Sequence, residues 1–308
     1  MPPLILHHYD GSPFSEKVRL MLGFKGLAWH SVKVPVIMPK PDVVALTGGY
    51  RKTPIMQSGA DVYCDTALIA RLLEQRAPTP SLFPAAAPLA PLLAQWADST
   101  LFWTVIPYTM QPAGAAQVFQ GVPPEVLKAF ATDRAPFTVG LKRQSVAEAT
   151  VNLSTCLGSL DAQLAVGGPF LLGADASIAD FAVAHCVWYV RRGGPVAQIM
   201  APHAKLLAWL ERMLAIGHGQ PTPMSSTDAL AVAAAATTHA STVVQPGLGF
   251  ELGQAVTVAP TDYGMDPVAG CLVGLTGEEV VIERHDERAG TVHVHFPRQG
   301  FQIKQEQR

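Results

Sequence analysis

The sequence predicts three parts in succession: an α/β domain, an all-α domain and a small all-β domain. Signals for strands and helices alternate over residues 1–78, and a helical period of 3.6 residues dominates residues 89–216. After Gly247 the composition switches to short β-branched runs separated by turn residues. A chain of 308 residues has room for two or three domains.

The composition is that of a folded protein without a strong charge of either sign. Hydrophobic residues make up 49% of the chain and charged residues 15%, which argues against intrinsic disorder. The formal net charge is only -2, so no basic field draws the chain to nucleic acid or to an anionic membrane. We therefore expect neither as a partner.

The cysteines and the first residues favour a reducing, cytoplasmic location. The four cysteines lie far apart and form no CxxC pair, which argues against a disulfide framework. The chain does not begin with a basic segment followed by a sustained apolar stretch, so we expect no signal peptide. No apolar run approaches the roughly 18 residues of a membrane span.

The first domain is expected at residues 1–80, where the order of the elements predicts an α/β fold. Apolar or alternating runs predict strands at residues 4–6 and 29–34 and a hairpin of strands 53–57 and 61–64. Helical periodicity predicts a helix at 12–26 and a second helix that begins after an Asp65 N-cap. The residues 36–50 between them are expected to form a loop.

The second domain is expected at residues 88–218, after a linker rich in proline and alanine at 78–91. Its periodicity predicts several packed helices with proline-rich breaks near 112–124 and 195–202.

The third domain is expected at residues 247–308, after an Ala-rich helix at 227–241. Short β-branched runs predict strands at 254–259, 270–275, 279–284, 291–296 and 301–305. Their regular spacing favours a small, separate antiparallel barrel of about five strands.

Ser12 is the first candidate for chemistry because it lies at the turn from a strand to a helix. Its hydroxyl is expected near the free N–H groups and the positive dipole end of the helix, which together stabilise an anion. A bound thiol at this place loses its proton more easily. The alternative is that Ser12 only caps the helix, with Pro13 at its first position.

The segment 12–19, followed by Gly26, resembles the active-site segment of glutathione transferases. The serine-type tau class has a similar Ser-Pro-Phe-Ser run, and the omega class has Cys-Pro-Phe at this place. The resemblance implies a thioredoxin-like domain in which Ser12 is catalytic and hydrogen-bonds the sulfur of glutathione. Because Ser12 is not a cysteine, chemistry through a mixed disulfide is disfavoured, and Tyr9 ranks lower as a sulfur contact.

A second segment, Lys52-Thr53-Pro54-Ile55 followed by Asp65-Thr66, resembles the Lys-Val-Pro-Val and Glu-Ser motifs of the same family. The resemblance implies a cis peptide bond before Pro54, which turns the backbone of Thr53 toward the cysteinyl part of glutathione. Pro54 and Ile55 are then expected to orient the tripeptide.

The same resemblance assigns the charged ends of glutathione. Asp65 is expected to hold the γ-glutamyl amino group, and Thr66 the carboxylate beside it, helped by the helix N-terminus. Lys52 is expected to attract the glycyl carboxylate, with Arg51 as a weaker candidate. Taken singly, Asp65 is equally well a helix cap and Lys52 a solvated charge.

The helical part carries one further motif and a candidate pocket. Ser177 and Asp180 form a capping-box variant that resembles the one in the transferases' C-terminal domain, and its role is structural. An apolar, aromatic run is expected to line an electrophile pocket or else to form ordinary helix core: Trp96, Leu101, Phe102, Trp103, Tyr108 and Met110, with Trp188, Tyr189, Arg191 and Arg192 as weaker candidates.

The resemblance does not extend to the C-terminal part. His293 and His295 share one face of a strand, where two histidines are able to ligate a metal. No third ligand has clear spacing, so we favour a polar outer face of the barrel and predict no metal. The segments 262–264 and 297–301 are interpreted either as a surface patch for a partner or as turn chemistry and core anchoring.

We therefore predict a glutathione transferase that uses glutathione as co-substrate and conjugates it to a small hydrophobic electrophile. The resemblance also implies a homodimer. The alternative is a non-catalytic binding protein whose barrel docks a partner, since a fold does not determine a function. A thiol–disulfide oxidoreductase is weaker because it would have to rely on Cys64.

Overall fold

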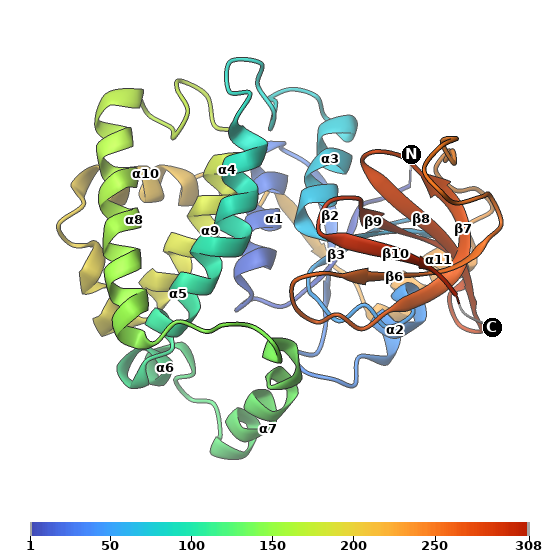
Figure 1. The fold of residues 1–308 in the computed structure, drawn as a ribbon, viewed down its shortest axis with the longest axis horizontal. Helices are drawn as coiled ribbons and strands as arrows, with labels where there is room; N and C mark the ends of the chain where they lie inside the picture. The colour runs from blue at the N-terminus through green and yellow to red at the C-terminus, as the bar shows by residue number, and fades with distance from the viewer. Residues whose placement is uncertain (1, 307–308) are drawn as a thin grey trace.

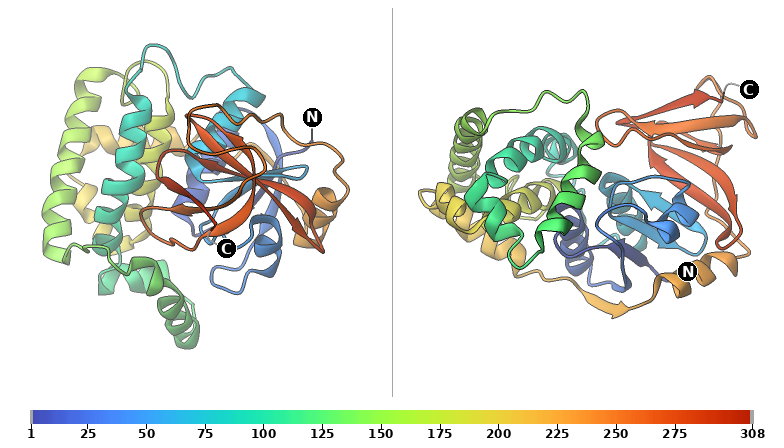
Figure 2. Two further views of the ribbon diagram at one scale, coloured as in Figure 1. Left: turned by 45° about the vertical axis from the view of Figure 1, so that its right-hand side comes forward. Right: turned by 90° about the horizontal axis from the view of Figure 1, so that it is seen from below.

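The computed structural model describes residues 2–306 and places an α/β region between a helical domain and a set of C-terminal strands (Figure 1). Figure 2 shows the same order from below, with the helices at one end and the C-terminal strands at the other. The domain limits expected at residues 1 and 308 lie outside the described residues. Within residues 2–306, no helix combines the length and the hydrophobicity that crossing a bilayer requires.

The α/β region has the thioredoxin-like arrangement that the resemblance implies. Its central strand β1 (Ile5–His8) pairs in parallel with β2 (Ala28–Lys33) and antiparallel with β3 (Ile55–Ser58). The predicted hairpin is confirmed, because β4 (Asp61–Cys64) pairs antiparallel with β3. The helices of this region are α1 (Pro13–Phe24), α2 (Pro41–Thr47) and α3 (Thr66–Arg76).

Local sequence explains where two of these helices begin and end. Ser12 caps α1, Pro13 is its first residue, and Gly26 follows with a φ of 63°, a backbone conformation that glycine adopts without steric cost. The loop predicted at 36–50 is wrong in part, because α2 lies within it. This seven-residue helix is too short to show a clear periodicity, but its ends are marked in the sequence: Pro41 begins it, and Gly48, with a left-handed backbone, follows its last residue.

The helical domain is built around the buried helix α9 (Ile178–Arg192). Asp180 closes the predicted capping box and also accepts a hydrogen bond from the indole N–H of Trp209 at 3.0 Å. The other elements are α4 (Ala90–Trp96), a π-helical turn (Ala97–Leu101), α5 (Phe102–Thr109), α6 (Pro112–Val118), α7 (Pro124–Arg134), α8 (Val146–Gly167) and α10 (Ala204–Leu214), with 3₁₀ turns at Pro136–Thr138 and Gly194–Met200. The break expected near 112–124 is thus partly helical.

The five C-terminal strands are confirmed, but the separate closed barrel is wrong. The strands are β6 (Ala255–Pro260), β7 (Val268–Leu275), β8 (Glu279–Asp286), β9 (Gly290–Pro297) and β10 (Phe301–Gln305). They form a single sheet with the α/β region, in the order β10-β6-β7-β8-β9-β4-β3-β1-β2-β5.

The junction between the two parts of the sheet explains why no barrel closes. β9 uses one edge for β8 and the other for a parallel pairing with β4, in which Asp61 lies opposite His293. The edge of β9 is therefore not free to meet β10. The far edge of the α/β strands is covered as well, because β5 (Gln220–Pro223) pairs with β2.

Two hydrophobic cores lie on opposite faces of β1. Leu4 and Leu6 belong to the core shared with the helical domain, whereas Ile5 between them belongs to the core shared with the C-terminal strands. Helix α11 (Ser226–Ala234) contributes Ala229 and Leu230 to this second core. The C-terminal strands thus share a core with the α/β region.

Candidate functional site

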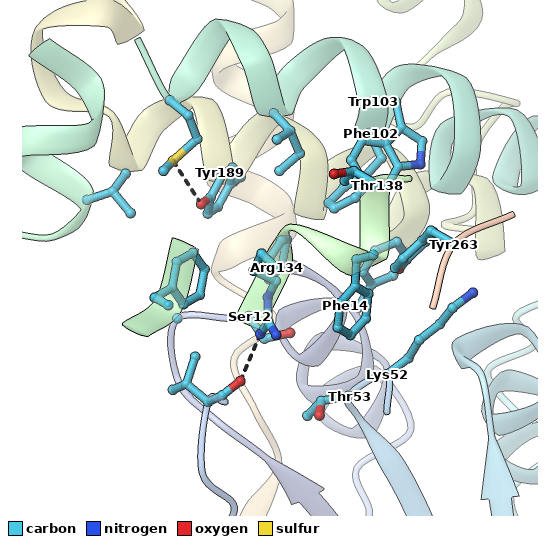
Figure 3. A pocket seen from close by; sticks show the side chains of 18 of the residues that line it. Ser12, Phe14, Lys52, Thr53, Phe102, Trp103, Arg134, Thr138, Tyr189 and Tyr263 are labelled. Atoms are coloured by element: carbon cyan, nitrogen blue, oxygen red, sulfur yellow. Dashed lines mark hydrogen bonds between the residues drawn. The ribbon is translucent and has the colours of Figure 1, made fainter. Parts of the chain in front are cut away.

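Ser12 lies in the wall of a cavity of about 800 Å³ between the α/β region and the helical domain (Figure 3). The side chain is 2% exposed, and its Oγ accepts a hydrogen bond from the backbone N–H of Ser15 at 3.2 Å. Because this bond uses a lone pair of the oxygen, the hydroxyl proton stays available to a group in the cavity. Both expected roles of Ser12, as cap and as donor, are therefore compatible.

A second cavity, of about 370 Å³, adjoins the first. Its wall includes Pro54, Asp65 and Thr66, and the Thr53–Pro54 peptide bond is cis as the resemblance implies. Lys52 and Thr53 line both cavities. The structure thus brings together six of the seven residues that the sequence singled out.

Ile55 is the residue that lies apart from this group. Ile55 is 1% exposed and lies in β3 opposite Cys64 of β4. It belongs to the core that is shared with the C-terminal strands. It is absent from both cavity walls formed within residues 2–306. Its part in orienting glutathione stays a prediction.

Asp65 has a backbone with a positive φ and a carboxyl group whose pKa is raised by burial. Its φ of 74° turns the side chain back so that an oxygen accepts the N–H of Ala67 at 2.9 Å. Burial raises the pKa of Asp65 above its usual value, although the ammonium of Lys52 partly offsets that effect. A cationic group of a ligand would stabilise the charged form of this carboxylate.

Lys17 is a residue that the sequence analysis missed. Its buried ammonium donates to Thr66 Oγ1 at 3.1 Å and to Asp98 at 2.5 Å, which ties α1 to α3 and to the π-helical turn. Asp98 also pairs with His185 at 2.9 Å. Burial alone would raise the pKa of Asp98, but these two partners bring it below its usual value.

Lys40 is a second residue that was missed. It precedes α2, is 2% exposed, and donates to Thr53 Oγ1 at 3.0 Å in the wall of the larger cavity. Burial, together with the charges of Arg134 and Arg51, lowers the pKa of Lys40 to about 8. Lys40 lies between two prolines, a pattern that indicates a turn. No motif in the neighbouring sequence indicated that its side chain would reach a binding site.

The C-terminal part reaches into the site through the loop between β6 and β7. Tyr263 lines both cavities and packs edge-on against Trp103 of α5, with the ring centres 5.1 Å apart (Figure 3). The Lys52 ammonium lies 4.0 Å from the centre of the Tyr263 ring and donates to Asp262 at 2.6 Å. Of the alternatives for 262–264, Tyr263 fits core anchoring, because its half-buried ring packs inside the cleft, whereas Asp262 stays exposed.

The helical wall of the larger cavity is apolar and aromatic. Of the ten expected lining residues, it contains Phe102, Trp103, Met110, Tyr189 and Arg192. The segment 118–143, which includes α7, adds aromatic and basic side chains that the sequence analysis did not single out, namely Phe119, Phe130, Phe137, Arg134, Lys142 and Arg143. Among the described residues, the charged side chains that line the larger cavity are cationic except for Asp10.

Comparisons with known proteins agree with this architecture. Residues 6–81 match the family model of the glutathione S-transferase N-terminal domain, and residues 143–212 match that of the C-terminal domain. A search of curated proteins gives no match.

Solved structures include a similar protein over the whole length. A GST-like protein from Pseudomonas syringae is 41% identical, with 99% of this chain and 100% of that chain covered and a TM-score of 0.82. A glutathione transferase from Phanerochaete chrysosporium is 19% identical, with coverage of 70% and 98% and a TM-score of 0.55. A tau class transferase from mango is 16% identical, with coverage of 69% and 89% and a TM-score of 0.52. The last two show the fold alone.

Proposed function

Since the chain belongs to the glutathione S-transferase family, we propose that it binds glutathione in the smaller cavity and conjugates it to an electrophile in the larger one. The observation that carries this proposal is the meeting of the two cavities at Lys52 and Thr53, with Ser12 in the wall of the larger one. A tripeptide bound along Thr53 would then project its thiol toward Ser12.

In this proposal Ser12 stabilises the thiolate of glutathione. Its hydroxyl donates to the sulfur, while its lone pair stays with the N–H of Ser15. The N-terminus of α1 adds a favourable potential for the negative charge.

The thiol proton passes to solvent, and a sulfur lone pair then forms a C–S bond to the electrophilic carbon. In a substitution the leaving group departs with the electron pair of its bond to that carbon; in an addition the π electrons move onto the electrophile, which then takes a proton from solvent. No covalent intermediate forms on the enzyme, so rate is gained from charge stabilisation and proximity.

The ends of the tripeptide are assigned to charged groups around the smaller cavity. Asp65 would hold the γ-glutamyl amino group, and Thr66 the neighbouring carboxylate, with the ammonium of Lys17 beside it. Lys52 precedes Thr53 in the chain and Lys40 hydrogen-bonds the Thr53 hydroxyl, and both would attract the glycyl carboxylate. Pro54 and Ile55 keep the backbone of this segment in place.

The larger cavity supports a hydrophobic co-substrate. Its wall of Phe102, Trp103 and Phe137 suits an aromatic or aliphatic body, and the cations Arg134 and Arg192 suit a polar or anionic tail. The proposal includes the homodimer that the family resemblance implies, which sedimentation at several protein concentrations would test.

The decisive experiment compares Ser12→Ala with wild type in two assays. We expect glutathione affinity, measured by calorimetry, to stay within a factor of about two, because the hydroxyl acts on the sulfur alone. Turnover with a panel of electrophiles should fall by about 10²-fold, as for the loss of one preorganised donor to a developing anion. Ser15→Ala is the matched control, since its side chain lies in the same helix and outside both cavity walls of the described residues.

The non-catalytic alternative has one specific observation in its favour. Lys52, the expected partner of the glycyl carboxylate, is already paired with Asp262 of the C-terminal part. If wild type binds no glutathione at millimolar concentration, the conjugation proposal is wrong, and a binding protein that uses the same cleft for another ligand becomes the better explanation.

A further inference from the structure

Three side chains with metal-ligating atoms meet where the C-terminal strands join the α/β region. Asp61 begins β4, His293 lies opposite it in β9, and His239 belongs to the segment that follows α11. One ligand atom from each residue lies within 4.8 Å of the other two. None of these three residues lines either of the two cavities formed within residues 2–306, so the cluster does not depend on the function proposed above.

The cluster contains two buried nitrogen atoms that lack a partner. Neither the Nδ1 of His239 nor the Nδ1 of His293 has a hydrogen bond within residues 2–306, and His293 is only 8% exposed. His293 Nδ1 lies 4.0 Å from Asp61 Oδ1, which is too long for a hydrogen bond. A buried polar atom without a partner costs about 1–3 kcal/mol, so such atoms normally have a ligand.

The surrounding groups orient these atoms as they do around bound metals. Glu283 lies 3.4 Å from Nε2 of His293, which places the proton on that nitrogen and leaves Nδ1 with a free lone pair. Asp61 is held on both oxygens, by the Nε2 of His295 at 2.9 Å and by the backbone N–H of Ala240 at 2.9 Å. Carboxylates that fix a histidine, and donors that fix a carboxylate, are the usual outer contacts of a metal site.

We propose that Asp61, His239 and His293 bind one divalent transition-metal ion of the Zn²⁺ type, with water as a fourth ligand. Two imidazole nitrogens and one carboxylate favour zinc over magnesium or calcium, which prefer oxygen ligands. The sequence predicted no metal, because His293 and His295 were the pair in question and no third ligand had clear spacing. In the structure His295 supports Asp61, and the third ligand comes from His239, 54 positions before His293.

Binding requires a small, local movement of His239. Its ring is stacked on that of His293, with centres 3.8 Å apart and planes 15° apart, so the lone pairs of the two rings lie in nearly parallel planes and do not meet at one point. Tetrahedral ligands at about 2.0–2.2 Å from zinc lie about 3.4 Å from one another, so the three atoms must close by about an ångström. His239 lies outside every helix and strand, and a rotation of its ring aims Nδ1 at a common point.

The ion would act as a structural clamp. It would join three segments: β4 of the α/β region, β9 of the C-terminal strands, and the connection between α11 and β6. Metal binding to a site that exists only in the folded state adds its binding free energy to folding. The clamp would thereby hold the C-terminal strands against the sheet that carries Asp65.

The test is a metal titration of the full chain after treatment with a chelator. Co²⁺ is added first, because a tetrahedral cobalt site gives intense visible absorption, and Zn²⁺ is then used to displace it. We expect one ion per chain and a rise in the melting temperature with Zn²⁺. His239→Gln and His293→Gln should each weaken binding by more than about 100-fold, and Glu283→Gln, which only positions His293, by about 10–100-fold.

His285→Gln is the matched control, since His285 is exposed on the neighbouring strand β8. It should leave both the affinity and the stabilisation by zinc unchanged. His239→Gln keeps the test valid if strand variants misfold, because position 239 lies outside regular structure. Absence of tetrahedral cobalt absorption in wild type, or equal metal affinity in wild type and His239→Gln, would overturn the proposal and leave a cluster bridged by water.

Discussion

At the scale of single residues, the proposed glutathione site depends on two ionisable groups with shifted pKa values. Burial raises the pKa of Asp65, and burial lowers that of Lys40 to about 8. Each group is needed in its charged form, Asp65 for an ammonium and Lys40 for a carboxylate. The proposed affinity for glutathione therefore has a limit on each side of neutral pH.

On the acid side we expect affinity to fall as pH is lowered through the raised pKa of Asp65. Protonation removes the charge that attracts the γ-glutamyl amino group, and the amino group itself stays protonated throughout. Calorimetric titrations between neutral and acid pH measure this fall. Asp65→Asn should bind weakly at neutral pH and lose the dependence; a variant that keeps the wild-type profile would remove Asp65 from the site.

On the alkaline side we expect affinity to fall as pH rises above about 8, where Lys40 loses its proton. Arginine stays charged at such pH, so Lys40→Arg should keep its affinity, whereas Lys40→Met should be weak at every pH. S-methylglutathione is the better probe here, because it has no thiol that titrates. Identical profiles for wild type and Lys40→Arg would show that the ligand, and not Lys40, causes the fall.

The sequence predicted the residues whose roles depend on their neighbours in the chain. Ser12 and Asp65 are helix caps at strand-to-helix turns, a short turn after β1 and directly after β4, so position along the chain places them at a site. Lys17, Lys40 and Tyr263 reach the same cavities through packing between distant segments. Lys17 contacts residues 49 and 81 positions away, and no local pattern predicts such a contact.

At the scale of elements, the loop between β6 and β7 is the segment through which the added C-terminal strands reach the candidate site. Its Asp262 pairs with Lys52 and, in the proposed site, would compete with the glycyl carboxylate of glutathione for that ammonium. The Asp262 side chain is 47% exposed, so this pair is screened by solvent and contributes about 0.2–1 kcal/mol.

We therefore expect Asp262→Ala to raise glutathione affinity by up to about fivefold, since 1.4 kcal/mol corresponds to a factor of 10. Asp266→Ala is the control, because Asp266 is an exposed acidic residue of the same loop. It removes the same charge from the loop without touching the Lys52 pair. A loss of affinity in Asp262→Ala, with Asp266→Ala unchanged, would mean that Asp262 supports the ligand site and does not compete with it.

The strands of the C-terminal part were predictable, but their partners were not. Alternating residues mark each strand, and β10 begins and ends where the sequence predicts. Pairing between β4 and β9 joins residues more than 200 positions apart, and the burial of His293 and His295 follows from that pairing. A histidine pair that suits an exposed face in a barrel becomes an interior pair in a continuous sheet.

At the scale of the whole molecule, the shared sheet and core imply that the C-terminal strands and the α/β region unfold together. Val294 of β9 is fully buried and lies opposite Val62 of β4, in the core that also contains Ile5. The five tryptophans lie between residues 29 and 209, outside the C-terminal strands. Apart from Trp103, which packs against Tyr263 of the C-terminal part, tryptophan fluorescence therefore reports on β9 through coupling between the two parts.

We expect Val294→Ala to destabilise the protein by about 2 kcal/mol, as for a buried aliphatic side chain truncated in a core. In urea titrations the tryptophan fluorescence and the far-UV circular dichroism should shift to lower urea together, because one cooperative transition moves both signals. Val243→Ala, at a valine that is 57% exposed, should shift neither. If the circular dichroism moved while the fluorescence midpoint stayed in place, the C-terminal strands would be an independent unit, and the continuous sheet would not carry stability across the β4–β9 junction.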